Sequence, residues 1–253
     1  MNKSPDYIII GAQRSGTTTL QALINQHPDA SATLGGVREE LHYFAWHRRY
    51  AWGLDWYKSR FPDCKVAGEK SPMYLQHPLV PMRIELKHLH TTKFIAVLRN
   101  PIDRAWSNWF KAKAKGFVEG RFMAHCTNED GLLTRELVEH GNFWGQYFWG
   151  SHHHLRGILA RGKYVEQLGE WLDRFGRDRV MVIQSERLFG NQHGTISQVY
   201  KFLGLDNFKP VVKHKQKFNY SKMPKSTRKW LTDYYRLHNL KLYDLIGEDY
   251  GWK

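Results

Sequence analysis

Residues 6–20 constrain the fold of this chain more than any other stretch. They read Asp-Tyr-Ile-Ile-Ile-Gly-Ala-Gln-Arg-Ser-Gly-Thr-Thr-Thr-Leu. The β-branched and aromatic run Tyr7–Ile10 predicts a buried strand, and the apolar spacing over 20–24 predicts a helix. Gly11 and Gly16 bracket the loop between them. A strand, a glycine-bracketed loop and a helix in this order direct backbone N–H groups and a helix N-terminus at a phosphate-like anion.

The loop resembles the Walker A pattern, Gly-x-x-x-x-Gly-Lys-Ser/Thr, but a threonine occupies the lysine position. A nucleotide hydrolase needs that lysine on the transferred phosphate and a hydroxyl on Mg²⁺. Here the cation comes three residues earlier, at Arg14, and hydroxyl side chains follow it. The candidate anion-binding residues are therefore Arg14, Ser15, Gly16, Thr17, Thr18 and Thr19. A glycine turn between any strand and helix is the structural alternative.

Strands alternate with helices along the rest of the chain. The predicted strands cover 65–68, 93–98 and 179–183, and the predicted helices cover 80–89, 101–114, 164–175, 197–203 and 226–246. This alternation predicts an α/β fold with a central parallel sheet flanked by helices on both faces. Since no repeat or low-complexity linker divides the chain, we expect a single domain over residues 1–253.

Composition narrows the class of partner. The 253 residues carry a formal net charge of +14, which predicts an acidic partner. Lys and Arg are dispersed without a nucleic-acid-binding motif, so nucleic acid is disfavoured. Two cysteines do not make a disulfide framework. With no long apolar run and no room for a signal peptide before the first strand, we expect a soluble, cytoplasmic protein without a membrane partner.

A second anion-binding motif, Arg-Asn-Pro-Ile-Asp-Arg-Ala-Trp-Ser, follows the predicted strand 93–98. The carboxyl end of such a strand is where open α/β sheets bind ligands. A Walker B site would place an aspartate here for Mg²⁺. Arg99 stands there instead and is suited to bidentate contact with a phosphate. This exchange disfavours an ATP- or GTP-hydrolysing enzyme.

Both motifs resemble those of sulfotransferases that use 3′-phosphoadenosine 5′-phosphosulfate (PAPS). Segments similar in order and spacing to heparan-sulfate-type sulfotransferases cover 40–44, 53–57, 69–74, 80–83 and 235–252. The chain is thus identified as a member of the PAPS-dependent sulfotransferase family. The resemblance implies the P-loop-containing nucleotide-binding fold and a single sulfotransferase domain. It also implies PAPS as sulfuryl donor, adenosine 3′,5′-bisphosphate (PAP) as product, and no required metal.

The resemblance also implies roles for catalytic residues. Glu40 matches the carboxylate that serves as the base in the heparan-sulfate enzymes, and we expect its apolar and aromatic surroundings to raise its pKa towards neutrality. Glu39 is interpreted as a solvated carboxylate. His42 assists the base or binds the acceptor, with a buried core histidine as the alternative. Lys70 matches a lysine near the sulfuryl group, and Arg14 matches a cation that contacts the bridging oxygen and stabilises the leaving PAP.

For the cofactor, the resemblance implies that backbone N–H groups of residues 16–18 hold the 5′-phosphate. Arg99 and Ser107 carry over as ligands of the 3′-phosphate. Lys215 and Lys217 lie where relatives have a basic loop over the 3′-phosphate and adenine. The usual Lys-Gly-Arg of that loop is absent here, and a solvated charge run is the alternative.

The acceptor is the least determined part. Unlike the heparan-sulfate enzymes, the chain shows no membrane anchor and no cysteine after Cys126, so we expect a small hydroxyl-bearing molecule, such as a specialised metabolite. The aromatic segments 43–57 and 141–149 are expected to line a compact pocket for it. The consecutive histidines 152–154 lack the spacing of zinc ligands, so no metal is expected.

Three alternatives stay open at this point. The high positive charge favours a carbohydrate acceptor, either a hydroxyl or an amine of an acidic glycan. A P-loop kinase-like enzyme is a second alternative, and a basic binding module for nucleic acid or membrane is a third. The sequence does not predict an oligomeric state.

Overall fold

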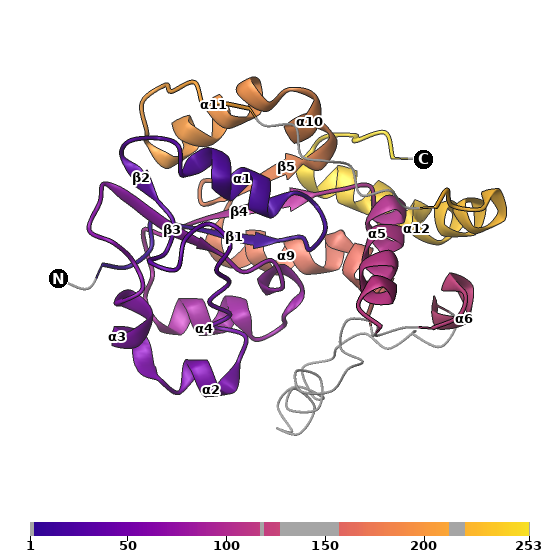
Figure 1. Ribbon diagram of the computed structural model, residues 1–253, viewed down its shortest axis with the longest axis horizontal. Helices are drawn as coiled ribbons and strands as arrows, with labels where there is room; N and C mark the ends of the chain where they lie inside the picture. The colour runs from indigo at the N-terminus through magenta and orange to yellow at the C-terminus, as the bar shows by residue number, and fades with distance from the viewer. Residues whose placement is uncertain (1–2, 117–118, 127–156, 213–220, 253) are drawn as a thin grey trace. The chain divides into compact units, whose positions relative to one another are not determined.

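The computed structural model describes residues 3–116, 119–126, 157–212 and 221–252 (Figure 1). The chain divides into two compact units. The first consists of Met1–Leu98 with Glu170–Lys215, and the second of Arg99–Gly169 with Gln216–Lys253. The first unit contains all the strands that the structure describes.

A five-stranded parallel sheet forms the centre of the first unit, in the order β2-β3-β1-β4-β5. The strands are β1 (Tyr7–Gly11), β2 (Ala30–Ser31), β3 (Val66–Lys70), β4 (Lys93–Leu98) and β5 (Val180–Gln184). The sequence predicted all of them except β2, with ends that differ by at most two residues. At two residues, β2 is too short to carry a periodic signal.

Both faces of the sheet are buried, which is why its strands read as continuous apolar runs. On one face Ile9 and Ile95 pack with Leu20 of α1 (Thr17–Ile24) and Val199 of α11 (Gln192–Leu203). On the other face the ring of Phe94 contacts two rings of α9 (Tyr164–Phe175). Its centroid lies 5.1 Å from Trp171 and 4.5 Å from Phe175. Figure 1 shows α1 and α11 on one side of the sheet and α4 on the other.

The remaining helical segments of the first unit are α2 (His47–Tyr50), α3 (Gly53–Lys58), η1 (Tyr74–Gln76), α4 (Val80–Leu86) and α10 (Ser185–Gly190). α4 ends three residues before the predicted end, where His88 takes a left-handed backbone with φ 52°. α11 begins five residues earlier than predicted because the side chain of Asn191 accepts a hydrogen bond from the Gly194 N–H and caps it.

The second unit is helical in its described residues. Its elements are α5 (Pro101–Ala114), α6 (Phe122–Cys126), η2 (Ala160–Gly162) and α12 (Lys225–Ile246). α5 covers the predicted range, with Asn100 accepting from the Ile102 N–H as its cap. The core joins residues of α5 to Leu231 and Tyr235 of α12.

Gly68 tests the close packing of the sheet. It pairs with Tyr7 of β1, and a Cβ on Gly68 would lie 2.4 Å from the Tyr7 ring. We expect Gly68→Ala to lower the free energy of unfolding by about 1–3 kcal/mol because a buried ring has to move. Urea denaturation measures it.

Gly169 of α9 provides the matched control, since no described atom lies within 4 Å of a Cβ built there. Gly169→Ala is expected to raise the free energy of unfolding by about 0.5–1 kcal/mol through helix propensity. Equal changes in the free energy of unfolding for the two substitutions would contradict the close packing of Gly68 against Tyr7.

Candidate active site

The loop after β1 forms an anion cradle at the N-terminus of α1. Gly16 caps this helix with a left-handed φ of 98°, and its cap makes no side-chain hydrogen bond. The first N–H groups of a helix have no partner within it, so they can bind an anion. A Cβ on Gly16 would lie 2.9 Å from the ring of the exposed Phe189, and the left-handed backbone is what favours glycine here. Thr17 and Thr19 are buried and Thr18 is half-buried.

Two further residues of the cradle carry features typical of a ligand site. Arg14 adopts a left-handed backbone with φ 69°, a costly conformation for a residue with a Cβ. Ser15 is fully buried, and its carbonyl accepts a hydrogen bond of 2.8 Å from the Ser185 hydroxyl. Its own Oγ has no hydrogen-bond partner among the described residues. A phosphate oxygen at the cradle would supply such a partner.

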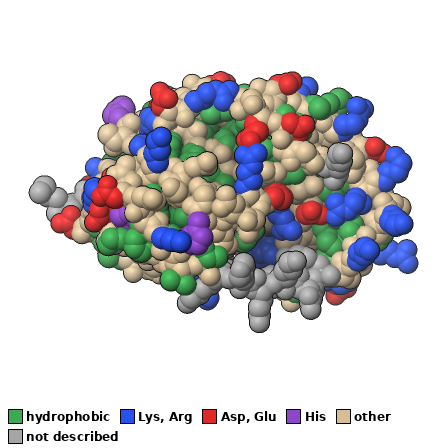
Figure 2. Space-filling model, turned by 90° about the horizontal axis from the view of Figure 1, so that it is seen from above, with side chains coloured by type: hydrophobic (Ala, Val, Ile, Leu, Met, Phe, Trp, Pro, Cys, Tyr) green, Lys and Arg blue, Asp and Glu red, His purple; other side chains and the backbone are tan. Residues whose placement is uncertain are grey.

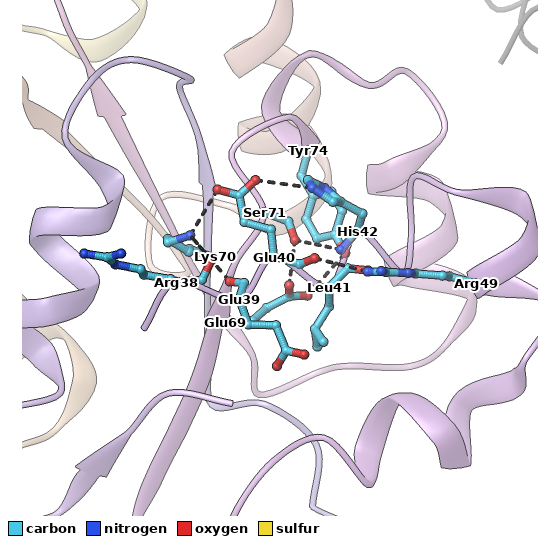
Figure 3. Close-up of polar contacts among 10 residues, drawn as sticks. All are labelled: Arg38, Glu39, Glu40, Leu41, His42, Arg49, Glu69, Lys70, Ser71 and Tyr74. Atoms are coloured by element: carbon cyan, nitrogen blue, oxygen red, sulfur yellow. Dashed lines mark hydrogen bonds and ion pairs between the residues drawn. The ribbon is translucent and has the colours of Figure 1, made fainter. Parts of the chain in front are cut away.

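The Glu40 carboxylate lies between Lys70 and His42 (Figure 3). Oε1 is 3.0 Å from Lys70 Nζ, and Oε2 is 3.2 Å from His42 Nε2. Lys70 ends β3 with its side chain 2% exposed, and its Nζ also donates to the carbonyls of Arg38 and Glu39, each at 3.4 Å. The structure therefore brings together three of the predicted catalytic residues.

The expected rise in the pKa of Glu40 is wrong. Burial raises the pKa of this carboxyl, but the hydrogen bond with His42 and the charge of Lys70 together outweigh burial. The pKa of Glu40 is therefore lowered, to about 2. The ammonium of Lys70, at the end of β3, contacts the carboxylate, so Glu40 is ionised at neutral pH.

Glu39 is not the solvated carboxylate that was expected. Its Oε1 forms an ion pair of 3.2 Å with Arg60, and its Oε2 accepts a hydrogen bond from the Gly35 N–H at 3.2 Å. The side chain is 25% exposed. Glu39 thus contributes to the shape of the loop, and its carboxylate is bound away from Lys70.

His42 and its neighbours form a stacked arrangement that the sequence did not predict. His42 has a left-handed φ of 50°, and its ring stacks on Trp46 with centroids 4.7 Å apart. The guanidinium of Arg49 lies 4.4 Å from the Trp46 ring centroid and donates to the carbonyls of Glu40 and Leu41. Arg49 therefore holds the backbone that carries the candidate base. The role of Arg49 depends on the turn at residues 41–46. This turn has no hydrophobic periodicity from which the sequence could have predicted it.

Glu69 is the second residue that sequence reasoning missed. It precedes Lys70 in β3 and is 1% exposed. The hydroxyls of Tyr57, Ser71 and Tyr74 donate to its carboxylate at 2.7, 2.7 and 3.2 Å. Burial raises the pKa of Glu69 to about 7, although these hydrogen bonds lower it. Glu69 begins the segment 69–74 that resembles the heparan-sulfate-type enzymes, but only its contacts show that the carboxylate is buried.

Part of the aromatic segment 43–57, which was expected to line a pocket, belongs to the core. Tyr43, Phe44 and Tyr57 are each 0% exposed, and the rings of Tyr43 and Tyr57 stack with centroids 4.6 Å apart. Trp46, Tyr50 and Trp56 are half-buried, and Trp52 is 54% exposed. The three buried rings are part of the core, because packing one aromatic ring against another removes a large apolar surface from water.

The second predicted anion motif lies in the second unit. Arg99 directly precedes the cap of α5 and is half-buried, and Ser107 is buried within α5. Arg104, between them, is 0% exposed and donates to the carbonyl of Ile158, so it supports the helix packing. That Arg99 and Ser107 bind a 3′-phosphate stays a prediction.

Several predicted sites lie outside the described residues. They are Lys215, Lys217, the aromatic segment 141–149 and the histidines 152–154. Within the described ranges, no three His, Cys, Asp or Glu side chains gather as metal ligands. The expectation that no metal is required stays a prediction.

Comparison with known proteins shows the family. The sulfotransferase domain family matches residues 4–241, so the chain belongs to it. Human heparan sulfate glucosamine 3-O-sulfotransferase 6 is 28% identical over an alignment 281 residues long, gaps included. The alignment covers 98% of this chain and 73% of that protein. The bifunctional heparan sulfate N-deacetylase/N-sulfotransferase 1 of Caenorhabditis briggsae is 29% identical over 209 residues. That alignment covers 81% of this chain but only 23% of the relative.

Solved structures agree on the fold. A sulfotransferase from Alicyclobacillus acidocaldarius has a TM-score of 0.76 at 23% identity, covering 98% of this chain and 97% of that one. The predicted PAPS-dependent sulfotransferase family and its P-loop-containing α/β fold are confirmed, and the protein is a transferase of sulfo groups. The single domain over 1–253 stays a prediction. Across the described residues, no helix is long and apolar enough to span a membrane.

The low pKa of Glu40 makes a prediction for acid stability. A carboxyl whose pKa falls from 4.5 to about 2 on folding stabilises the protein above pH 4.5, and this contribution disappears as the pH falls towards 2. We therefore expect the free energy of unfolding to fall less over this window in Glu40→Gln than in the wild type. Urea denaturation at stepped pH measures it.

Glu39→Gln is the control, because it removes a carboxylate from the same loop without removing a partner of Lys70 or His42. Parallel pH curves for wild type and Glu40→Gln would show that the Glu40 carboxylate is not held by Lys70 and His42 in solution.

Proposed function

We propose that the protein transfers the sulfuryl group of PAPS to a hydroxyl acceptor, with Glu40 as the base. The arrangement of Glu40 between Lys70 and His42 carries this proposal. It lies at the carboxyl end of β3, and the anion cradle follows β1, the parallel neighbour of β3. The carboxyl ends of neighbouring parallel strands share one edge of a sheet, where α/β proteins bind ligands.

The donor is proposed to bind through the cradle. Backbone N–H groups of residues 16–18 would hold the 5′-phosphate, and Arg14 would stabilise the negative charge that develops on the leaving PAP. The buried Ser15 hydroxyl without a partner supports an anion there. Arg99, Ser107, Lys215 and Lys217 remain the proposed ligands of the 3′-phosphate.

A carboxylate with a pKa of about 2 is a weak base, and the Lys70 ion pair is one cause of that low value. An anionic sulfuryl group beside Lys70 would compete with Glu40 for the ammonium. Loss of this partner would raise the pKa of Glu40 towards its ordinary value and strengthen it as a proton acceptor. Lys70 would then stabilise the sulfuryl oxygens while Glu40 takes the acceptor proton.

Two acceptor classes are candidates. The sequence favoured a small hydroxyl-bearing molecule, but the ring-lined pocket that supported it is partly core, since Tyr43, Phe44 and Tyr57 are buried. A carbohydrate is the second candidate. It is supported by the similarity over 98% of the chain to an enzyme named for heparan sulfate glucosamine, and by the net charge of +14. A cytoplasmic location stays a prediction.

The alternatives outside this class have less support. The threonine in the Walker lysine position and Arg99 in the Walker B position disfavour a kinase. For a nucleic-acid module, Lys and Arg would be expected to form a continuous stripe. On the face drawn in Figure 2 several of them gather at the right end of the view, and the others lie at separate places among acidic and apolar side chains, without a continuous stripe.

Replacement of the base tests the mechanism. We expect Glu40→Gln to lower kcat by about 100-fold or more, because the amide cannot accept the acceptor proton. Binding of PAP should change little, since the cradle is untouched. Transfer from sulfur-labelled PAPS measures kcat, and Glu39→Gln, whose carboxylate pairs with Arg60, is the matched control. Equal turnover in wild type and Glu40→Gln would exclude Glu40 as the base.

An acceptor screen tests the substrate class. The probes are a set of phenols and primary alcohols and, separately, a heparosan oligosaccharide, each with labelled PAPS. Sulfation of the small hydroxyl compounds alone would support the small-molecule class. Sulfation of the oligosaccharide alone would replace that class with the carbohydrate. Labelled product in neither set, with ATP turnover in the presence of Mg²⁺, would contradict the proposed function.

A further inference from the structure

Two consecutive residues at the end of β3 hold the loop 38–44 from two sides (Figure 3). Lys70 contacts the Glu40 carboxylate and backbone carbonyls of the loop. Glu69 lies on the amide side of the same loop, which it reaches through hydroxyl groups and through a backbone hydrogen bond from Leu41. The pairing of β3 with β1 fixes the register of both residues in the sheet. The loop therefore takes its position from one strand end.

Each of two hydroxyls connects the Glu69 carboxylate to a loop amide. Ser71 Oγ donates to Glu69 Oε2 at 2.7 Å and accepts from the His42 N–H at 3.0 Å. Tyr74 OH donates to Glu69 Oε1 at 3.2 Å and accepts from the Phe44 N–H at 3.2 Å. An ionised carboxylate can only accept hydrogen bonds, so it directs both hydroxyl hydrogens towards itself. Their lone pairs then face the amides of the loop.

His42 needs this support because of its backbone. Its φ of 50° is in the left-handed region, which a residue with a Cβ keeps only where its surroundings hold it. Its Nε2 lies 3.2 Å from the Glu40 carboxylate. We propose that Glu69 is a positioning residue for sulfuryl transfer, acting through Ser71 and Tyr74 on the backbone of His42 and Phe44. This inference rests on the proposed function of the Glu40 site.

The ionisation of Glu69 gives the proposal a second test, the pH dependence of activity, which a purely structural role would not change. The groups that face it are the hydroxyls of Tyr57, Ser71 and Tyr74, the backbone N–H of Leu41 and, at longer range, the charge of Arg49. Burial raises the pKa of both tyrosines well above 10, so neither titrates near neutrality. Burial raises the pKa of Glu69 to about 7. Activity should therefore fall as the pH drops below about 7, and Glu69→Gln should lack this dependence.

Steady-state kinetics with labelled PAPS test the proposal. We expect Glu69→Gln to lower kcat about tenfold or more, with the KM for PAPS and the affinity for PAP changed less than about twofold. Tyr57→Phe and Tyr74→Phe form a matched pair, because both hydroxyls donate to the same Glu69 oxygen, but only that of Tyr74 accepts from a loop amide. Tyr74→Phe should lower kcat more than Tyr57→Phe.

Hydrogen exchange of the His42 and Phe44 amides provides a test that does not require activity. Both amides should exchange about tenfold faster in Glu69→Gln, and the His42 amide alone in Ser71→Ala. Ser71→Ala also replaces Glu69→Gln if that variant fails to fold.

Three results would overturn the proposal: unchanged exchange, unchanged kcat in Glu69→Gln, or equal losses in the two tyrosine variants. Absence of sulfuryl transfer in the wild type would instead contradict the proposed function, while exchange would still test the anchoring of the loop.

Discussion

The ion pair between Lys70 and Glu40 is the interaction on which the rest of the site depends. Lys70 is 2% exposed at the end of a central strand, and a buried ammonium without a partner is strongly destabilising. The loop 38–42 therefore has to close over the strand end, with two carbonyls and one carboxylate around Nζ. Because β3 pairs with β1, the same constraint sets the candidate base Glu40 and the anion cradle at one edge of the sheet.

The ion pair is also consistent with the proposed role of Glu40, a carboxylate with a low pKa, as the base. Lys70 and His42 keep Glu40 ionised, so the carboxylate can accept a proton without first losing one. A sulfuryl anion that draws Lys70 away would strengthen the base only when the donor is present. The two carboxylates at this strand end thus have opposite shifts: the pKa of Glu40 is lowered, and that of Glu69 is raised by burial.

Much of the fold could be predicted because its signals are local. The apolar run of β1, the glycines of the cradle and Pro101 at the start of α5 each act within a few residues. The resemblance identified Glu40, His42 and Lys70, which the structure brings together. The direction of the shift in the pKa of Glu40 could not be predicted, because it depends on a lysine 30 positions away in the sequence. Glu69, Arg49 and the burial of Tyr43 were missed for the same reason: each depends on how the loop 38–46 folds over β3.

The central claim is that the chain binds a nucleotide with phosphates at both the 3′ and 5′ positions. Binding of PAP, compared with ADP plus Mg²⁺, tests this claim most directly. A ligand that binds only the native state stabilises it by about 2.7 kcal/mol at a hundred times its Kd. A thermal-shift titration should therefore show a clear rise in Tm with PAP and little change with ADP and Mg²⁺. A rise with ADP and Mg²⁺ alone would contradict the claim and favour a kinase-like enzyme.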